Sequence, residues 1–170
     1  ISTNEEKIKI VNSPSNKKYK IYERVKKILA SEKYQEIITF SFHSAFSHKA
    51  LKGDASLKLS NAISEEFSYM RNSMFGNHLN ILEENRKKGF EQQSVFEIGP
   101  IYQDINSQDN ILSMMAFSIK GINTVFQNEI FDFNKLSIQI TMLLKELNFD
   151  IQQFVIKRSE NSMFHPGQSA

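Results

Sequence analysis

Ser94–Tyr102, with the sequence SVFEIGPIY, decides the fold. Most of its residues are good strand formers. Alternation along a strand places them on two faces, with Phe96, Ile98 and Tyr102 on one and Val95, Glu97 and Ile101 on the other. Both faces are largely apolar, which predicts a central strand covered on both sides. Glu97 needs a partner, because a buried carboxylate is costly without one, and Gly99-Pro100 predicts a bulge or bend.

The segments around this strand alternate between helical and strand patterns. Helices are expected near Tyr19–Glu32, Phe75–Lys88 and Asp132–Leu147, with Leu79 and Leu82 pointing inward and Gly89 ending the second helix. Shorter elements are expected at Gln35–Phe42 (strand), His43–Lys52 (helix), Leu57–Leu59 (strand), Ile111–Ile119 (strand antiparallel to the central one) and Ile151–Lys157 (strand). The order predicts an α+β fold with a mainly antiparallel sheet and helices packed mainly on one face.

Composition limits the class of protein. The chain has 170 residues, a net charge of +2 and no cysteine, which excludes disulfides, thiolate zinc sites and a cysteine nucleophile. No apolar run approaches the ~18 residues of a membrane helix, and no secretory signal opens the chain, so we expect a cytoplasmic protein without membrane contact. Residues 1–18 are polar and predict a lead-in, followed by one domain over residues 19–170.

Few side chains suggest catalysis. His165 is better explained as a turn residue than as a catalytic base, because no nucleophile accompanies it. His43 and His48 lack the further ligands of a metal site, and His78 is expected on a helix surface. Arg71 and Glu97 lie in apolar surroundings, so an internal ion pair is favoured over a substrate contact. The basic runs Lys17-Lys18, Lys26-Lys27 and Arg86–Lys88 are expected to be solvated helix faces, with a contact to a phosphate backbone as the alternative for the last.

Several segments, taken in order, resemble the β subunit of bacterial phenylalanyl-tRNA synthetase. They are SNAISEEFSYMR (Ser60–Arg71) with Ser73, Asn85, FEIG (Phe96–Gly99), FHPGQSA (Phe164–Ala170), and Asp132 with Lys135. The similarity is to the catalytic-like module, a class II synthetase fold without an active site. The chain departs from the family pattern at Ala62, Gly76-Asn77 and Gln168, which affects loop shapes. The resemblance marks seven structural motif residues: Arg71, Asn85, Glu97, Gly99, His165, Pro166 and Gly167.

The resemblance implies a non-catalytic assembly module of a phenylalanine–tRNA ligase. In active class II enzymes a motif 2 arginine neutralises phosphate charge; Gln103 stands at that place, and the glycine-rich motif 3 is missing. This chain alone is therefore expected to be inactive and to hold no cofactor. ATP and magnesium are implied for the whole enzyme, an (αβ)₂ heterotetramer that acts on the phenylalanine tRNA. Rival interpretations are a working class II ligase and a free-standing RNA- or protein-binding domain.

The helix Tyr19–Glu32 and the strand Gln35–Phe42 occupy the place of motif 1, which by resemblance builds the subunit interface. The helix carries more apolar residues than one narrow stripe, and a surplus apolar face typically marks a partner site. The expected contacts to the α subunit are Ile21, Tyr22, Val25, Ile28 and Leu29. The alternative is that all five belong to the internal core.

Overall fold

A computed structural model describes residues 17–118, 133–155 and 157. The strand β4 (Gln92–Asp104) lies in the middle of a three-stranded sheet with the order β1–β4–β5. β1 (Gln35–Glu36) pairs with β4 in parallel, and β5 (Ser107–Ser118) pairs with it antiparallel, with Val95 opposite Met115. The predicted central position of Ser94–Tyr102 and its antiparallel partner are therefore confirmed.

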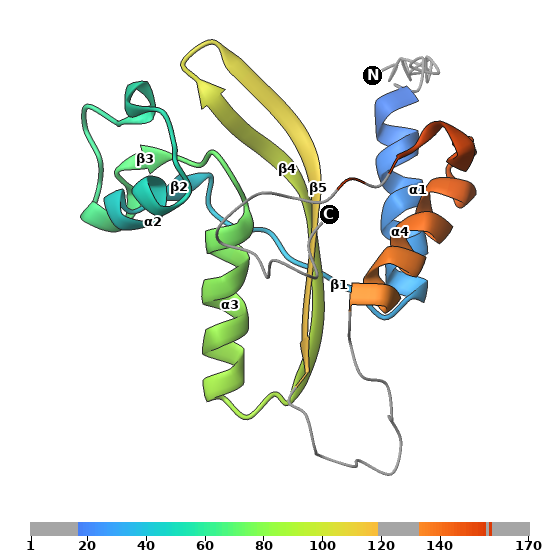
Figure 1. Cartoon of the computed structure of the whole chain (residues 1–170). Coiled ribbons are helices and arrows are strands. Elements are labelled where there is room, and N and C mark those ends of the chain that lie inside the picture. The colour runs from blue at the N-terminus through green and yellow to red at the C-terminus, as the bar shows by residue number, and fades with distance from the viewer. Residues whose placement is uncertain (1–16, 119–132, 156, 158–170) are drawn as a thin grey trace, which may run out of the picture.

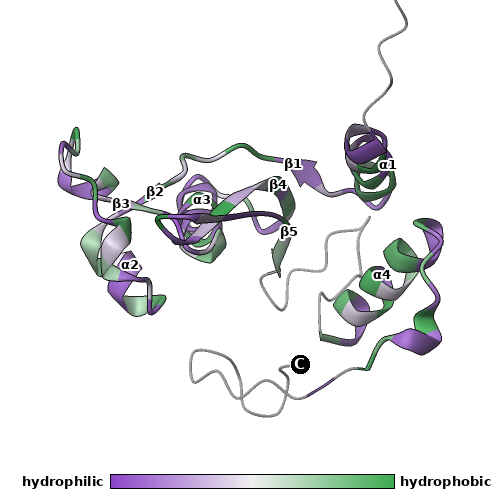
Figure 2. Ribbon diagram, turned by 90° about the horizontal axis from the view of Figure 1, so that it is seen from above, coloured by the Kyte–Doolittle hydropathy of each residue, from purple (hydrophilic) through white to green (hydrophobic). Residues whose placement is uncertain are grey.

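Helices cover both faces of this sheet (Figures 1 and 2). α1 (Lys17–Ser31) and α4 (Phe133–Glu146) lie on one side, and α3 (Phe75–Lys87) lies on the other. The α+β class is confirmed, but the expectation of helices mainly on one face is wrong. Val95 and Glu97, on the second face of β4, are also buried. This face therefore needs a helix of its own to cover it.

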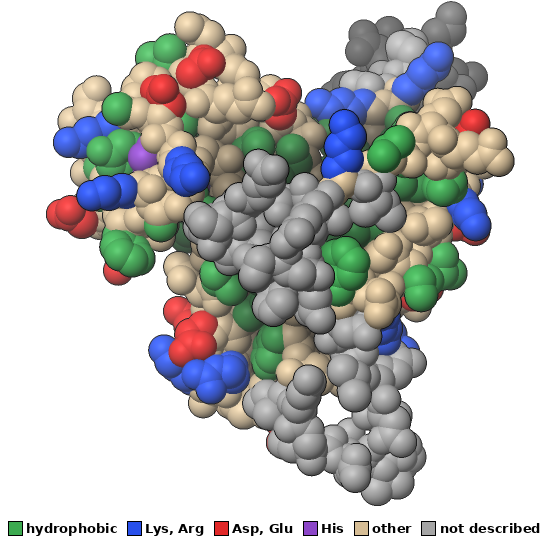
Figure 3. Space-filling model, in the orientation of Figure 1, with side chains coloured by type: hydrophobic (Ala, Val, Ile, Leu, Met, Phe, Trp, Pro, Cys, Tyr) green, Lys and Arg blue, Asp and Glu red, His purple; other side chains and the backbone are tan. Residues whose placement is uncertain are grey.

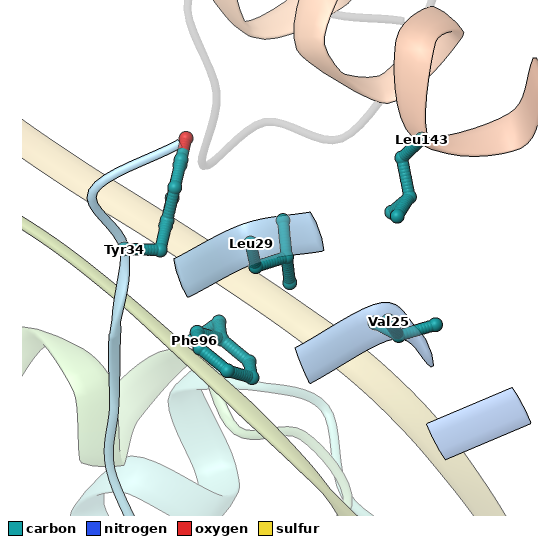
Figure 4. Close-up of a cluster of buried hydrophobic side chains, with 5 residues drawn as sticks. All are labelled: Val25, Leu29, Tyr34, Phe96 and Leu143. Atoms are coloured by element: carbon teal, nitrogen blue, oxygen red, sulfur yellow. The ribbon is translucent and has the colours of Figure 1, made fainter. Parts of the chain in front are cut away.

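The hydrophobic core lies between β4 and the helix pair α1–α4 (Figure 4). Its buried members are Val25, Leu29, Tyr34, Phe96 and Leu143. The Tyr34 hydroxyl donates a 2.8 Å hydrogen bond to Gln139 Oε1 on α4. Burial, with a smaller contribution from Glu32, raises the pKa of Tyr34 to about 12. This tyrosine therefore stays neutral and ties the chain after α1 to α4.

A second, smaller lobe follows β1. It contains the antiparallel pair β2 (Phe42–His43) and β3 (Tyr69–Met70), the helix α2 (Ala45–Ala50) and two 3₁₀ turns, η1 (Ala55–Leu57) and η2 (Glu65–Phe67). The strand predicted at Leu57–Leu59 is wrong: Asp54 caps a 3₁₀ turn there, and Lys58 forms only one bridge, to Tyr69. The strand predicted at Gln35–Phe42 is present only at its two ends, because its middle leaves the sheet.

The ends of several helices and strands differ from the prediction. α1 already includes Lys17 and Lys18, which were assigned to the lead-in. α3 ends before Gly89, whose φ of +93° suits a glycine, as predicted. The strand expected from Ile151 is wrong over its first residues, where Asp150 caps the 3₁₀ turn η3 (Ile151–Gln153). Asp132, Ile119 and the motif His165-Pro166-Gly167 lie outside the described residues.

Among the helices of the described ranges, none has both the length and the apolar character needed to cross a bilayer.

Candidate functional site

The charged groups of Arg71 and Glu97 meet inside the protein, between the sheet and the second lobe. Arg71 Nη1 donates to Glu97 Oε1 at 2.9 Å, and the two side chains are 1% and 4% exposed. Thr39 joins them: its hydroxyl accepts from Arg71 Nη1 at 2.8 Å and donates to Glu97 Oε2 at 2.7 Å. The predicted internal ion pair is therefore confirmed. Glu97 lies on the β4 face away from the α1–α4 core, as the alternation of the strand requires.

His78 on α3 completes this network. Its Nε2 lies 3.2 Å from Glu97 Oε2, and its Nδ1 lies 3.3 Å from the Ser113 hydroxyl on β5. The ring is fully buried, so the expectation of a surface histidine is wrong. One sequence signal could have revealed this position: His78 precedes the buried Leu82 by one helical turn, and residues four apart share a helix face. Leu79, predicted to point inward, is exposed instead.

The network fixes the charge of Glu97. Burial on its own would raise the pKa of Glu97, but hydrogen bonds from His78, Thr39 and Arg71 and the Arg71 charge outweigh it and lower the pKa to about 2. Glu97 is therefore ionised at physiological pH, and both of its oxygens accept hydrogen bonds. A carboxylate bonded in this way stabilises the fold. Neither of its oxygens is free to take a proton from a substrate.

Gly99 leaves space for the guanidinium of Arg71, and the Pro100 carbonyl accepts a hydrogen bond from it. The β4–β5 register passes regularly through Gly99 and Pro100, and the irregularity falls between Tyr102 and Asp104, so the predicted bulge is misplaced. A Cβ on Gly99 would lie 2.7 Å from Arg71 Nη2. Arg71 Nε also donates to the Pro100 carbonyl at 2.7 Å. The motif glycine is thus required by the close approach of Arg71.

Replacing Gly99 by alanine is expected to destabilise the fold by about 1–3 kcal/mol, because the new methyl group must displace a guanidinium that buried partners hold. Chemical denaturation measures this loss. Gly76→Ala is the matched control: a Cβ on Gly76 would meet only ordinary contacts, the nearest at 3.6 Å from Leu51 Cδ1. Equal stability of the two variants would contradict the tight fit at Gly99.

The same network anchors residues 37–42, which join β1 to the first residue of β2. The Ile37 amide donates to the Phe96 carbonyl, and the Arg71 amide donates to the Ser41 carbonyl, both at 2.9 Å. Asn77 Nδ2 donates to the carbonyls of Phe40 and Phe42. Thr39 points inward, whereas its neighbours Ile38 and Phe40 are 89% and 68% exposed. The buried network therefore holds this segment so that two large apolar side chains face solvent.

The predicted interface on α1 is only partly available. Val25 and Leu29 are buried in the core (Figure 4), and Ile28 packs against that core. Val25 and Leu29 follow the alternative of internal packing, so they are corrected as contact residues for a partner, whereas the partly buried Ile28 stays a prediction. Tyr22 is half-buried, and Ile21 is 52% exposed. The segment after the helix exposes two further large apolar side chains, Ile38 and Phe40.

Within the part of the chain that the structure describes, the other candidate residues do not gather into a reactive centre. Gln103 is exposed, and its amide donates to Asp109 Oδ2 at 2.9 Å. This neutral group does not fit ATP, because it supplies no positive charge for the phosphates. Asn85 donates to Gln93 Oε1 at 2.9 Å, which links α3 to β4. Arg86 and Lys87 pair with Glu83 on the exposed side of α3, as expected of a solvated face.

His43 and His48 are both buried rather than placed at a surface site. Burial, followed by the nearby His48 and Arg71, lowers the pKa of His43 to about 4, so His43 is neutral at physiological pH. His48 stacks on Tyr69, with 4.2 Å between ring centroids, and its Nε2 contacts the Asp54 carbonyl. Within the described ranges, no group of three or more histidine or carboxylate residues could hold a metal ion.

The sequence matches the family described as "Phenylalanyl tRNA synthetase beta chain CLM domain" over residues 1–170. Two similar proteins, both called phenylalanine–tRNA ligase beta subunit, come from Ehrlichia canis (28% identity over 154 residues, 88% of this chain) and Rickettsia prowazekii (32% over 138 residues, 75% of this chain). The chain covers 20% and 17% of their lengths, so it spans about a fifth of the curated relatives it matches.

Two solved structures of a pyrrolysyl tRNA synthetase from Desulfitobacterium hafniense share the fold. One has a TM-score of 0.58 at 11% identity and covers 78% of this chain and 45% of that chain; the other has 0.63 at 10% and covers 85% and 51%. At this identity the likeness shows the architecture alone, and it confirms the class II synthetase fold.

Proposed function

The chain belongs to the phenylalanyl-tRNA synthetase β chain CLM domain family, and from that premise we propose that it is the non-catalytic assembly module of a phenylalanine–tRNA ligase. The module, residues 19–170, holds the α subunit in an (αβ)₂ heterotetramer. That assembly attaches phenylalanine to its tRNA in the cytoplasm. ATP and magnesium bind at the α subunit, where the reaction takes place.

One observation carries the assembly role: the buried network fixes residues 37–42 with Ile38 and Phe40 exposed. In an active site, an ionised Glu97, an arginine and a histidine would face a cavity. Here Arg71, Glu97 and His78 are all inaccessible and satisfy one another. Large apolar side chains at fixed, exposed positions are typical of a protein-binding surface. The segment also has the place of motif 1, which the resemblance assigns to the subunit interface.

The experiment that tests the non-catalytic role is phenylalanine-dependent pyrophosphate exchange. We expect no exchange above background with the purified chain alone, and exchange when the α subunit is added to the full-length β chain. Gln103→Arg should remain inactive without the α subunit, because one guanidinium does not replace the missing motif 3. Exchange by the isolated chain, with or without that substitution, would contradict the proposal.

A further inference from the structure

A cleft of about 490 Å³ lies between the second lobe and α3. Residues of β2, α2 and η2 line one side of it, and one face of α3, from Gly76 to Lys87, lines the other. Its volume is in the range of small-molecule sites, roughly 300–1,000 Å³. Arg71, Glu97 and His78 are not among its lining residues, so the cleft is distinct from the buried network.

His43 lines this cleft and has an unpaired ring nitrogen. The residue is 4% exposed, and its Nε2 has no hydrogen-bond partner among the described residues. A hydrogen bond between the ring and the backbone of Ser73 acts to raise the pKa of His43, which is the effect of a carbonyl acceptor. Nδ1 therefore carries the proton of the neutral imidazole, and Nε2 keeps a lone pair. A buried acceptor in this state costs free energy unless a donor reaches it.

Asn77 supplies a second unpaired acceptor. Its Nδ2 donates to the carbonyls of Phe40 and Phe42, at 3.1 and 3.3 Å. Carbonyl groups only accept hydrogen bonds, so they fix the orientation of the amide. Its Oδ1 is buried and lacks a partner within the described ranges. Two residues that line the cleft thus hold buried acceptors that only a donor can satisfy.

The charges and rings of the cleft favour a cation. Glu66 and Glu84 line it and are exposed, and neither forms a salt bridge with another described residue. Lys87 also lines the cleft, but it is paired with Glu83 at 3.5 Å. Figure 3 shows acidic side chains on the surfaces of the second lobe and of α3. Three aromatic rings line the same cleft: Phe42, Phe46 and Phe67. Carboxylates and aromatic faces both attract a positive charge.

We propose that this cleft binds a small alkylammonium ion, whose N–H groups donate to His43 Nε2 and Asn77 Oδ1 while its carbon chain lies against the phenylalanine rings. An ammonium group has donors and no acceptor, so it matches a pair of acceptors. An anion does not fit, because the lone pairs and the carboxylates repel it. A metal ion needs several ligands together, and the described residues hold no group of three or more histidine or carboxylate ligands. One water takes only about 30 Å³ and leaves most of the cleft unused.

The test is a ligand-observed NMR titration of the purified full-length β chain with n-butylammonium chloride. Tetramethylammonium is the matched probe, because it is an isomer with the same charge and no N–H donor. We expect saturable binding of butylammonium and binding of tetramethylammonium that is weaker by about tenfold or more, since charge-assisted hydrogen bonds are strong. Nα-acetyl-lysine N-methylamide carries the same ammonium group on a peptide unit. Tighter binding of this probe than of butylammonium would assign the site to a lysine side chain of another protein, and weaker binding to a free amine.

Substitutions in the cleft give a second measurement. His43→Phe removes one acceptor but keeps an aromatic ring, and it should lower the butylammonium affinity by about tenfold or more. Glu66→Gln with Glu84→Gln changes only exposed side chains, so the fold should be retained, and it should weaken binding by about threefold at low salt. Glu91→Gln with Glu146→Gln is the matched control, because both residues are exposed and neither lines the cleft.

Equal affinity for the two isomeric cations would overturn the proposal, as would full affinity in a folded His43→Phe chain or equal effects of the two glutamate pairs. Butylammonium that does not saturate the chain would assign the two acceptors to buried water only. Circular dichroism checks that the variants are folded. Assembly with the α subunit does not enter these measurements, so the proposed function and this inference can fail separately.

Discussion

Replacing Arg71 by methionine is expected to lower the free energy of unfolding by about 3–5 kcal/mol. The substitution keeps much of the side-chain volume but leaves the ionised Glu97 buried without its cation. It also removes the donors to the Thr39 hydroxyl and the Pro100 carbonyl. Breaking a buried pair on one side is costly, because the remaining charge has lost its hydration and its partner alike. Urea denaturation at pH 7 measures the loss.

Arg86→Met is the matched control. Arg86 also pairs with a glutamate, Glu83, but the pair is exposed on α3, where solvent screens the two charges, so its loss should affect stability far less. A small effect of both substitutions would contradict the role given to the Arg71–Glu97 pair.

The pH dependence of stability provides a second measurement on the same variant. In wild type the Glu97 pKa of about 2 lies below the ordinary value of 4.5. Glu97 therefore stabilises the fold above about pH 4.5, and that contribution is lost as the pH falls through 4.5 toward 2. Without Arg71 the pKa of Glu97 moves up toward its ordinary value of 4.5, so the stability that Glu97 loses between pH 4.5 and 2 should become smaller in the variant. An unchanged acid profile would show that Arg71 does not hold the charge of Glu97.

The parts of this fold that local pattern determines could be predicted from the sequence. The alternation in Ser94–Tyr102 separates the core-facing Phe96 from Glu97, and it fixes a central strand with two buried faces. A buried carboxylate beside apolar neighbours requires a cation, and Arg71 supplies it. α4 forms where the sequence predicts a helix and places Leu143 in the core, but it buries Gln139, which bonds to Tyr34, and leaves the apolar Ile140 43% exposed.

The remaining features depend on contacts between distant residues. His78 shares a helix face with the buried Leu82, but its two partners, Glu97 and Ser113, come from two different strands, and helix periodicity does not identify them. The strand predicted at Gln35–Phe42 is interrupted because Thr39 bonds to Arg71 and Glu97 instead of continuing the sheet. Val25 and Leu29 were assigned to a partner interface, since the sequence does not show that α4 covers them.

Assembly with the α subunit should be lost when the exposed apolar residues of the segment 37–42 are changed. Ile38→Asp with Phe40→Asp places two carboxylates on side chains that are 89% and 68% exposed, so the fold of the β chain should be retained. Each charge would be buried without a partner at the subunit interface. Central apolar contacts of this kind contribute about 2 kcal/mol or more each, so we expect affinity to fall at least about 100-fold.

Phe46→Asp with Ile63→Asp is the matched control. These side chains are 83% and 96% exposed and belong to other segments of the second lobe than residues 37–42. They have the same chemistry and comparable exposure, so this pair separates the loss of a specific contact from a general effect of surface charge. Val25→Asp is unsuitable for this purpose, because Val25 belongs to the core and its substitution would unfold the module.

Co-purification of the α subunit with a tagged full-length β chain, compared among wild type and these two double variants, tests the assembly role most directly. The α subunit should be recovered with wild type and with Phe46→Asp/Ile63→Asp, and should be absent with a normally folded Ile38→Asp/Phe40→Asp chain. Equal recovery of the α subunit with all three chains would contradict the assignment of residues 37–42 to the subunit interface.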